Sequence, residues 1–595
     1  MPNSIAEIVK ERIVARHQGD GKQLEVVFSP SSRLLVEAPA GYGKTNTMVS
    51  KIAYMIATKQ IPNPKRLLAL TFSVNAAYKI KKDVTQQVPI LLVDTGLNIN
   101  TSDKIFVSNY HGFCRSVLKK YGSVFHSLLK SIDTLQSVDD SKVKENQENI
   151  KGLSYDDAYF MSEYCDALKK SDATFLSKNL NKYCAVIIKD FLPAGCISYN
   201  AILTLTQKLF KEYPNILNFY TSYYNTLLVD EYQDTNILSF EIINSLITPE
   251  SKVILLGDSL QRIYGFIGAV EQLLSISEKE FKLTKIELSR NYRFASNPEM
   301  LKLDNNIRRN AENTLKPKIT EDARIDFTIA STQSLEALEV VKKSLLIIEK
   351  NPTSKVAILV KQRGNNVNSI IATFELHKIP FFYGLFTDED SGYLTFHRKC
   401  LYEFKELIRV KETIFKKLAT EHVARIKKLY AESSDSVIAA LINLLEIFWS
   451  KIFSDFTFLS NEEKINLVKD TFEHNSLKQY IEFVNTNIII STVHAAKGLE
   501  WDFVILPDME QDSFPNWYGL CGACKCRSDC KISINTDNET KFLEELSVFY
   551  VAVTRARKQV FFTASQTAPD KNGTDRQKNI SCFLSLPGIK YQGHL

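Results

Sequence analysis

The chain has 595 residues, of which 44% are hydrophobic and 24% are charged, and its formal net charge is +6. These figures indicate an ordinary globular protein of about three to four structural units. The mild basicity permits nucleic-acid binding without requiring it. Ten cysteines in so long a chain argue against a disulfide scaffold.

Membrane and export signals are weak in this sequence. No uninterrupted apolar run reaches the ~18 residues of a membrane span, and residues 1–16 lack the apolar core of a signal peptide. The cysteine usage favours a reducing compartment. We therefore expect a cytoplasmic protein that has no membrane partner.

The first candidate site is the stretch 38–45, which reads APAGYGKT. It follows an apolar run at 34–36, typical of a buried strand, and precedes a helical pattern at 46–57. This context is the one that a phosphate-binding loop requires, which makes a chance turn before a helix the weaker interpretation. We expect Lys44 to reach the β- and γ-phosphates and the Thr45 hydroxyl to hold Mg²⁺. The other loop residues expected around the phosphates are Ala38, Gly41 and Gly43, with Ala38 standing where the pattern usually has glycine.

Two further apolar runs, at 67–72 and 104–107, predict strands that lead into helices. An aromatic ring and a hydroxyl at a strand end, followed by a helix N-terminus, can stack a base and hold a backbone phosphate. A strand packed by its aromatic ring beside a solvated lysine face explains the first run equally well. After the second run, a histidine could contact DNA or cap the helix. The candidate DNA contacts here are Thr71, Phe72, Asn75 and His111.

Residues 121–217 look helical and irregular. The phosphate loop and the next acidic strand end lie too far apart for one crossover, so we expect a helical subdomain to be inserted between them. Within it, residues 133–152 are polar with few apolar anchors. This composition predicts a mobile loop or an exposed helix.

A buried strand at 227–229 ends in the adjacent acids Asp230 and Glu231. Asp230 can hold Mg²⁺ directly or through water, and Glu231 can orient and deprotonate an attacking water. The alternative is a solvated turn, which the presence of a phosphate loop disfavours.

The strand at 253–256 is followed by Gln261, Tyr264 and Phe266. Gln261 could report the γ-phosphate, and the two rings could stack on bases. Core packing is the preferred explanation for one of the two rings.

A short Asn-Tyr-Arg sequence at 291–293 offers the aromatic face of Tyr292 and the planar guanidinium of Arg293, which suits phosphate. Farther on, Arg555 lies beside small residues at a helix end, where it suits a charge-stabilising finger. A lone arginine at such a place is more often part of a surface salt bridge.

A second α/β unit is expected from about residue 323, with strands at 356–360, 488–490, 503–506 and 560–563.

Four cysteines, Cys521, Cys524, Cys526 and Cys530, fall within ten residues with the spacing C-x2-C-x-C-x3-C. Four thiolates can complete a tetrahedral Zn²⁺ site or hold an iron–sulfur cluster. The spacing is tighter than that of two separated C-x2-C knuckles. This tight spacing counts against regular tetrahedral geometry. Structural zinc is nevertheless the leading hypothesis, with an iron–sulfur cluster and free thiols as alternatives.

In their order along the chain, these motifs resemble those of superfamily 1 DNA helicases of the UvrD/Rep/PcrA type over nearly the full length. The resemblance implies an ATP hydrolase that uses ATP and Mg²⁺ and moves 3′ to 5′ on single-stranded or forked DNA. The matching stretches are APAGYGKT, LALTFSVNAA, LLVDEYQDTN, LLGDSLQRIYGFIGA, LSRNYRF, STVHAAKGLEWDFVILPDM and FYVAVTRAR.

The resemblance also implies roles for single residues. Gln23 would read adenine, Tyr292 would stack on it, and Glu500 would touch the nucleotide sugar. The two arginines would reach the γ-phosphate from either side of a cleft between the domains, and Gln261 would couple that phosphate to DNA. The implied catalytic set is Lys44, Asp230, Glu231, Gln261, Arg293 and Arg555. The implied DNA-binding set is Thr71, Phe72, Asn75, His111, Tyr264, Phe266 and His494.

Some positions depart from the family pattern. Phe266 stands where the family usually has tryptophan, Ile267 stands where it has arginine, and Leu546 and Ser547 replace a basic pair. These departures bear on processive unwinding more than on ATP hydrolysis. Compact UvrD-like proteins, the Gabija helicase subunit among them, also act with nucleases in anti-phage defence. The alternative function is therefore a DNA-sensing ATPase subunit that regulates a partner nuclease without processive unwinding.

The expected fold is two RecA-like α/β lobes with parallel sheets flanked by helices, each with an inserted helical subdomain. The first lobe is expected at 1–112 and 218–290, with its insertion at 113–217. The second is expected at 291–387 and 486–595, which includes the cysteine cluster at 521–530, with its shorter insertion at 388–485.

Overall fold

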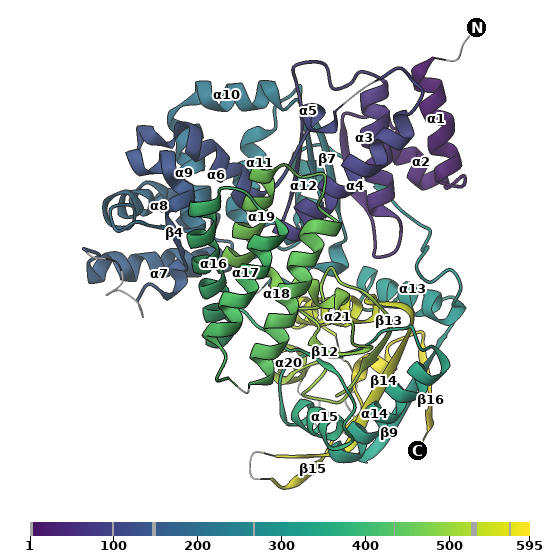
Figure 1. Ribbon diagram of the computed structural model, residues 1–595. Coiled ribbons are helices and arrows are strands. Elements are labelled where there is room, and N and C mark those ends of the chain that lie inside the picture. Colours follow the sequence, from purple (N-terminus) through teal and green to yellow (C-terminus); the bar gives the residue numbers. More distant parts are fainter. Residues whose placement is uncertain are drawn as a thin grey trace. The chain divides into compact units, whose positions relative to one another are not determined.

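The computed structural model describes residues 4–97, 100–144, 150, 152–265, 268–433, 435–524, 532, 534–570 and 573–594. The chain divides into two compact units, Met1–Arg290 and Asn291–Leu595, and Figure 1 labels many of their helices and strands. Each unit contains a mostly parallel sheet flanked by helices, so the predicted α/β fold class is confirmed.

The sheet of the first unit has six parallel strands in the order β3-β2-β6-β7-β1-β8. Because strand order differs from chain order, the loops that follow β1, β6 and β7 leave the same edge of the sheet from neighbouring positions. The strands are β1 Arg33–Glu37, β2 Leu67–Thr71, β3 Ile105–Asn109, β6 Thr226–Val229, β7 Lys252–Gly257 and β8 Thr284–Glu287.

Helices cover both faces of this sheet, which explains why its strands are apolar almost without interruption. Leu34 and Val36 of β1 join a core with α1–α4, whereas Leu35 joins the core of the opposite face. The helices flanking the sheet are α1 Ile5–Arg16, α2 Gly21–Phe28, α3 Lys44–Ala57, α4 Val74–Leu92, α5 Thr101–Lys104, α6 Tyr110–Tyr121, α11 Ile237–Leu246 and α12 Leu273–Glu280.

Between β3 and β6 the chain forms a mainly helical subdomain whose core is continuous with one face of the sheet. Residues 133–144 within it are more ordered than the sequence predicted. Asp140 is buried and accepts hydrogen bonds from the Tyr183 hydroxyl and, at 3.0 Å, from Asn200 Nδ2. The expected exposed stretch is therefore wrong for this part, because a polar side chain anchors it. The main elements are β4 Gln136–Val138, α7 Tyr155–Lys169, α8 Ala173–Val186, β5 Cys196–Ser198, α9 Tyr199–Glu212 and α10 Pro214–Tyr223.

The second unit has an eight-stranded sheet in the order β11-β12-β10-β13-β14-β9-β16, with β15 antiparallel to β14. The strands expected at 356–360, 488–490, 503–506 and 560–563 are present, and β14 is longer than expected. The strands are β9 Ala323–Thr332, β10 Val356–Val360, β11 Phe382–Gly384, β12 Ile488–Thr492, β13 Trp501–Leu506, β14 Ala556–Pro569, β15 Asp575–Gln577 and β16 Ile589–His594.

One face of this sheet packs on α14 and α15, and Phe549 of α21 packs on Phe562 of β14. The helices beside the sheet are α13 Pro298–Glu312, α14 Gln333–Lys350, α15 Asn365–Leu376, α20 Gly522–Cys524 and α21 Glu539–Val553. A helical subdomain between β11 and β12 contains α16 Ser391–Lys411, α17 Lys416–Leu429, α18 Ser436–Ser454 and α19 Asn461–Glu473.

Helix α18 is the one helix in the described part of the chain that is long and apolar enough to cross a membrane. Its buried residues include Leu444 and Phe448, and Trp449 Nε1 donates a hydrogen bond to His422 of α17 at 3.0 Å. The apolar side of α18 thus packs inside the helical subdomain, as core helices of globular domains do.

Candidate active site

The phosphate-binding loop connects the end of β1 to α3, which begins at Lys44. Gly41 and Gly43 adopt positive φ angles of 84° and 82°, which glycine tolerates at little steric cost. Thr45 lies in the first helical turn, where backbone N–H groups have no partner within the helix. The loop therefore presents donors and the positive end of a helix dipole to an anion.

Lys44 forms the central ion pairs of this site. Its Nζ lies 3.0 Å from Asp230 Oδ1 and also pairs with Glu231 Oε1. Burial lowers the pKa of the Lys44 ammonium, but the two carboxylates outweigh burial and raise that pKa overall. Lys44 therefore stays charged beside the acids that follow β6.

Glu231 has a left-handed backbone, with φ of 51°, a conformation that costs energy for a residue with a side chain and is enriched at functional sites. Its Oε2 accepts a 2.6 Å hydrogen bond from Gln233 Nε2. The side-chain oxygen of Gln233, Oε1, in turn accepts from the backbone N–H of Asp258 at 3.1 Å. Gln261 Nε2 donates to Asp258 Oδ2 at 2.8 Å. A continuous polar chain thus joins the predicted catalytic acid to the predicted phosphate sensor.

Gln233 is a site residue that sequence reasoning did not single out. A Cβ atom at Gly257 would lie 2.8 Å from Gln233 Oε1, so the glycine that ends β7 leaves room for this amide. The only sequence signal was the place of Gln233 two residues after Glu231.

The predicted DNA-contact residues of the first unit lie at the end of β2 and in the segments that follow β2, β3 and β7. The rings of Phe72 and Tyr264 stack on each other, with centroids 5.3 Å apart and planes 24° apart. Thr71 Oγ1 and Asn75 Nδ2 are buried, and each lacks a hydrogen-bond partner in the described part of the chain. His111, in the first turn of α6, packs edge-on against Tyr199. Phe266 lies outside the described residues.

Gln23 is buried in the first turn of α2. Its Nε2 donates to the backbone oxygen of Tyr42 in the phosphate loop at 3.0 Å. The amide that the sequence assigns to adenine is therefore in direct contact with the loop assigned to phosphate.

In the second unit, Arg293 donates to the Thr554 carbonyl and forms an ion pair with Glu500. Arg555 is 4% exposed, and its guanidinium donates to the carbonyls of Val551 and Leu499 at 2.9 and 3.1 Å. The predicted nucleotide-site residues Arg293, Glu500 and Arg555 are therefore brought together within this unit.

Tyr292 and His494 are partly buried in the second unit. Burial and the nearby Lys361, Lys497 and Lys478 lower the pKa of His494 to about 4. Its imidazole is thus neutral near pH 7 and can accept as well as donate a hydrogen bond.

Family comparisons match both units. A UvrD/REP helicase N-terminal domain matches residues 20–282, and a UvrD-like helicase C-terminal domain matches residues 393–567. The chain belongs to the UvrD/Rep helicase family. Members of this family are ATP-hydrolysing enzymes, so the predicted enzyme class is confirmed, and so is the resemblance.

Several curated relatives align over nearly the whole chain. A probable DNA helicase II homolog of Rickettsia felis is 25% identical, with 93% of each chain covered. The ATP-dependent DNA helicase Rep of Buchnera aphidicola is 26% identical over 89% of this chain and 92% of its own. The ATP-dependent DNA helicase PcrA of Staphylococcus epidermidis is 24% identical over 92% of this chain and 83% of its own.

The cysteine cluster of this UvrD-like chain is only partly described, since Cys526 and Cys530 lie outside the described residues. Cys521 is buried, and its Sγ donates to the Pro515 carbonyl at 3.2 Å. Cys524 Sγ accepts from Asn538 Nδ2 at 3.6 Å.

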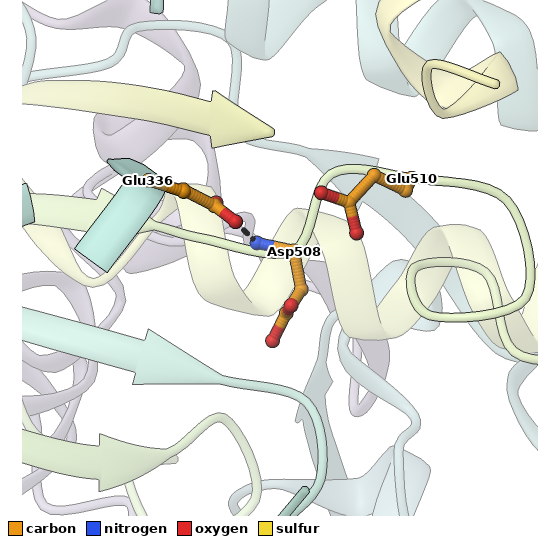
Figure 2. A group of neighbouring side chains, drawn as sticks. All are labelled: Glu336, Asp508 and Glu510. Atoms are coloured by element: carbon orange, nitrogen blue, oxygen red, sulfur yellow. Dashed lines mark hydrogen bonds between the residues drawn. The ribbon is translucent and has the colours of Figure 1, made fainter. Parts of the chain in front are cut away.

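A buried acidic cluster in the second unit was not predicted, and Figure 2 shows its three members. Glu336 of α14 lies beside Asp508 and Glu510 of the loop after β13, with carboxylate oxygens within 4.8 Å of one another. Glu336 Oε1 accepts from the Asp508 backbone N–H at 3.0 Å and from the Thr563 hydroxyl at 2.6 Å. These bonds join α14 to β14 and to the loop after β13. The cluster thus has a structural role within this UvrD-like unit.

Burial and the neighbouring carboxylates raise the pKa of Glu336 well above its usual value, and the pKa of Glu510 is raised as well. Burial, with the neighbouring Asp508 charge, raises the pKa of Glu510 from 4.5 to about 7, although hydrogen bonds from Ser565 and the charge of Lys578 oppose the shift. Its Oε2 lacks a hydrogen-bond partner in the described part of the chain, and a proton there could supply one.

Replacing Lys44 with alanine or Glu231 with glutamine should abolish DNA-stimulated ATP hydrolysis. The first change removes the phosphate-binding charge, and the second removes the base while keeping the hydrogen-bonding shape, so each should lower kcat by about 10²-fold or more. Phosphate release measured with and without single-stranded DNA tests this. Lys342→Ala, at an exposed lysine of α14, is the matched control, and wild-type turnover in either site variant would remove the catalytic assignment.

Glu510→Gln should remove part of the pH dependence of stability. Because folding raises the pKa of Glu510, its contribution is present below about pH 4.5 and is lost as the pH rises through about 7. The melting temperature should therefore fall less in Glu510→Gln than in the wild type between pH 5.5 and 8.5, measured with EDTA present. Parallel melting curves for the two proteins would contradict the protonated state, and Glu339→Gln on the exposed side of α14 is the control.

Proposed function

We propose that this protein moves 3′ to 5′ along single-stranded DNA and separates duplexes, with ATP hydrolysed in a cleft between its two lobes. The observation that supports this best is the pairing of Lys44 with Asp230 and Glu231, at the carboxyl ends of β1 and β6. A cation, two acids and a helix N-terminus at one sheet edge match the needs of a triphosphate and its metal.

In the proposed mechanism, Mg²⁺ would be held by the Thr45 hydroxyl and Asp230, and it would neutralise charge on the phosphates. Lys44 would leave its acidic partners to contact the β- and γ-phosphates. Glu231, then released from Lys44, would accept a proton from the attacking water. Gln233, already bonded to Glu231, would hold that carboxylate in place.

The second lobe would complete the site. Arg293 and Arg555 would stabilise the charge that develops on the γ-phosphate, with Tyr292 stacked on the base and Glu500 near the sugar. The carbonyl oxygens that bind Arg555 support such a role because they fix the guanidinium in one orientation, which lowers the entropy lost on binding phosphate.

DNA would bind at the same edge of the first lobe. The polar chain from Glu231 through Gln233 and Asp258 to Gln261 offers a route by which the state of the γ-phosphate changes the position of Tyr264. A base could insert between Tyr264 and Phe72 or replace one ring in their stack. The Thr71 hydroxyl and Asn75 Nδ2, which have no hydrogen-bond partner among the described residues, suit a DNA phosphate.

One observation favours the alternative, a cytoplasmic DNA-sensing ATPase that controls a partner nuclease in anti-phage defence. Leu546 and Ser547, which replace the basic pair of the family pattern, are buried on α21. The Ser547 hydroxyl donates to the Leu543 carbonyl within the helix. These positions offer no charge to DNA, which would weaken strand separation more than ATP hydrolysis.

A displacement assay on forked duplexes separates the two functions. The helicase proposal predicts ATP-dependent strand release from a duplex with a 3′ single-stranded tail and little release from one with a 5′ tail. Hydrolysis stimulated by single strands without release from either substrate would contradict the helicase proposal and support the sensor.

We also propose that the cysteine cluster holds structural zinc, through Cys521 and Cys524 together with Cys526 and Cys530. The backbone N–H of Asp512 and the side-chain amide of Asn538, which donate to Cys521 Sγ and Cys524 Sγ, would orient the thiolates. Metal analysis of anaerobically purified protein decides between zinc, an iron–sulfur cluster and free thiols, and a folded, metal-free sample would end the proposal.

A further inference from the structure

His17 lies at the end of α1 and is only 2% exposed. Its Nε2 lies 2.8 Å from the Ser50 hydroxyl, two turns into α3. Its Nδ1 contacts Oε1 of Gln23. One buried imidazole therefore links α1, α2 and the helix that follows the phosphate loop.

The chemistry of the partners fixes the roles of both ring nitrogens. Gln23 Oε1 can only accept, so His17 Nδ1 must carry the hydrogen, and Nε2 then accepts from the Ser50 hydroxyl. Asn46 Nδ2 lies 3.3 Å from the same Nδ1, a longer contact that cannot be a hydrogen bond in this tautomer. Burial, the largest influence, lowers the pKa of His17, which favours the neutral ring that this arrangement needs.

The Gln23 amide is thereby held from both ends. Its oxygen accepts from His17, and its nitrogen donates to the Tyr42 carbonyl. Each end keeps one further valence, a lone pair on Oε1 and a hydrogen on Nε2. Gly43 fits tightly against this amide, since a Cβ there would lie 2.3 Å from Gln23 Nε2.

We propose that His17 is a positioning residue for nucleotide selection, which fixes the Gln23 amide in the orientation that pairs with adenine and ties it to the phosphate loop. The remaining acceptor and donor of the amide match the amino group and ring nitrogen at the edge of adenine. The corresponding edge of guanine carries two acceptors. A glutamine that could rotate by 180° about its last side-chain bond would lose this distinction. Rotation would set Oε1 against the Tyr42 carbonyl, which can only accept, and would cost the contact with the Nδ1–H of His17. This inference rests on the proposed ATP site.

Two substitutions test the contacts of the two ring nitrogens one at a time. The side-chain amide of His17→Asn can place a donor near the position of Nδ1, whereas that of His17→Gln reaches toward the position of Nε2. His17→Asn should thus keep the contact with Gln23 and lose the contact with Ser50, and His17→Gln should do the reverse. Ser50→Ala removes the second contact alone and is the matched control.

The test measures binding of fluorescent ATP and GTP analogues, together with kcat and KM for both nucleotides. His17→Gln should lose about tenfold in preference for ATP, the effect of one buried hydrogen bond, with KM for ATP rising more than kcat falls. His17→Asn should stay within about threefold of the wild-type preference. Gln23→Ala sets the value for complete loss of base selection.

Equal selectivity in the wild type, His17→Gln and His17→Asn would overturn the inference, as would equal loss of selectivity in His17→Asn and His17→Gln with unchanged melting temperatures. Failure of the proposed function is a different result, because the wild type itself would then bind neither analogue and would not hydrolyse ATP.

Discussion

The ion pairs of Lys44 with Asp230 and Glu231 are the constraint around which the first unit is arranged. Two adjacent carboxylates at the end of a buried strand repel each other and lose hydration, so they need a cation nearby. In the sheet, only β7 separates the strand before Lys44 from the strand before Asp230. The same cation and acids suit a triphosphate with its metal, so the arrangement that stabilises the fold also prepares the site.

From this point, hydrogen bonds extend the site mainly through neutral amides. Gln233 binds Glu231 on one side and the Asp258 backbone on the other, and Asp258 holds Gln261. On the opposite flank, Gln23 binds the phosphate loop and is held by His17. Neutral amides are suited to this work because each can donate and accept at once. They would therefore transmit the position of a phosphate without the desolvation cost of a buried charge.

Most of the features that could be predicted from the sequence are patterns of residues that lie close together along the chain. The phosphate loop connects a strand directly to a helix. The apolar pattern of these two elements and the glycines between them therefore identify it. The acids after β6 could also be identified, because they are adjacent in sequence and directly follow an apolar strand. The chain divides into two compact units at Arg290, ahead of the second run of strands, which begins with β9.

Contacts between distant segments could not be predicted in this way. Glu336 meets Asp508 and Glu510 only because α14 packs beside the sheet that places the loop after β13. Asp140 looked like part of a polar loop, yet Tyr183 and Asn200 bury and satisfy it. The His17–Ser50 contact likewise depends on how α1 folds back on α3. In each case a polar residue, ordinary in sequence, acquires its role from partners that only the fold brings near.

The central claim is that both lobes act on one triphosphate, and Arg555 tests it most directly. We predict that Arg555→Lys and Arg555→Ala lower DNA-stimulated kcat by about 10³-fold while the affinity for a fluorescent ATP analogue changes less than tenfold. Arg309→Ala, at an exposed arginine of the same unit, is the control, and melting curves confirm folding. Turnover within twofold of the wild type in a folded Arg555→Ala protein would contradict the claim, because hydrolysis would then need only the first lobe.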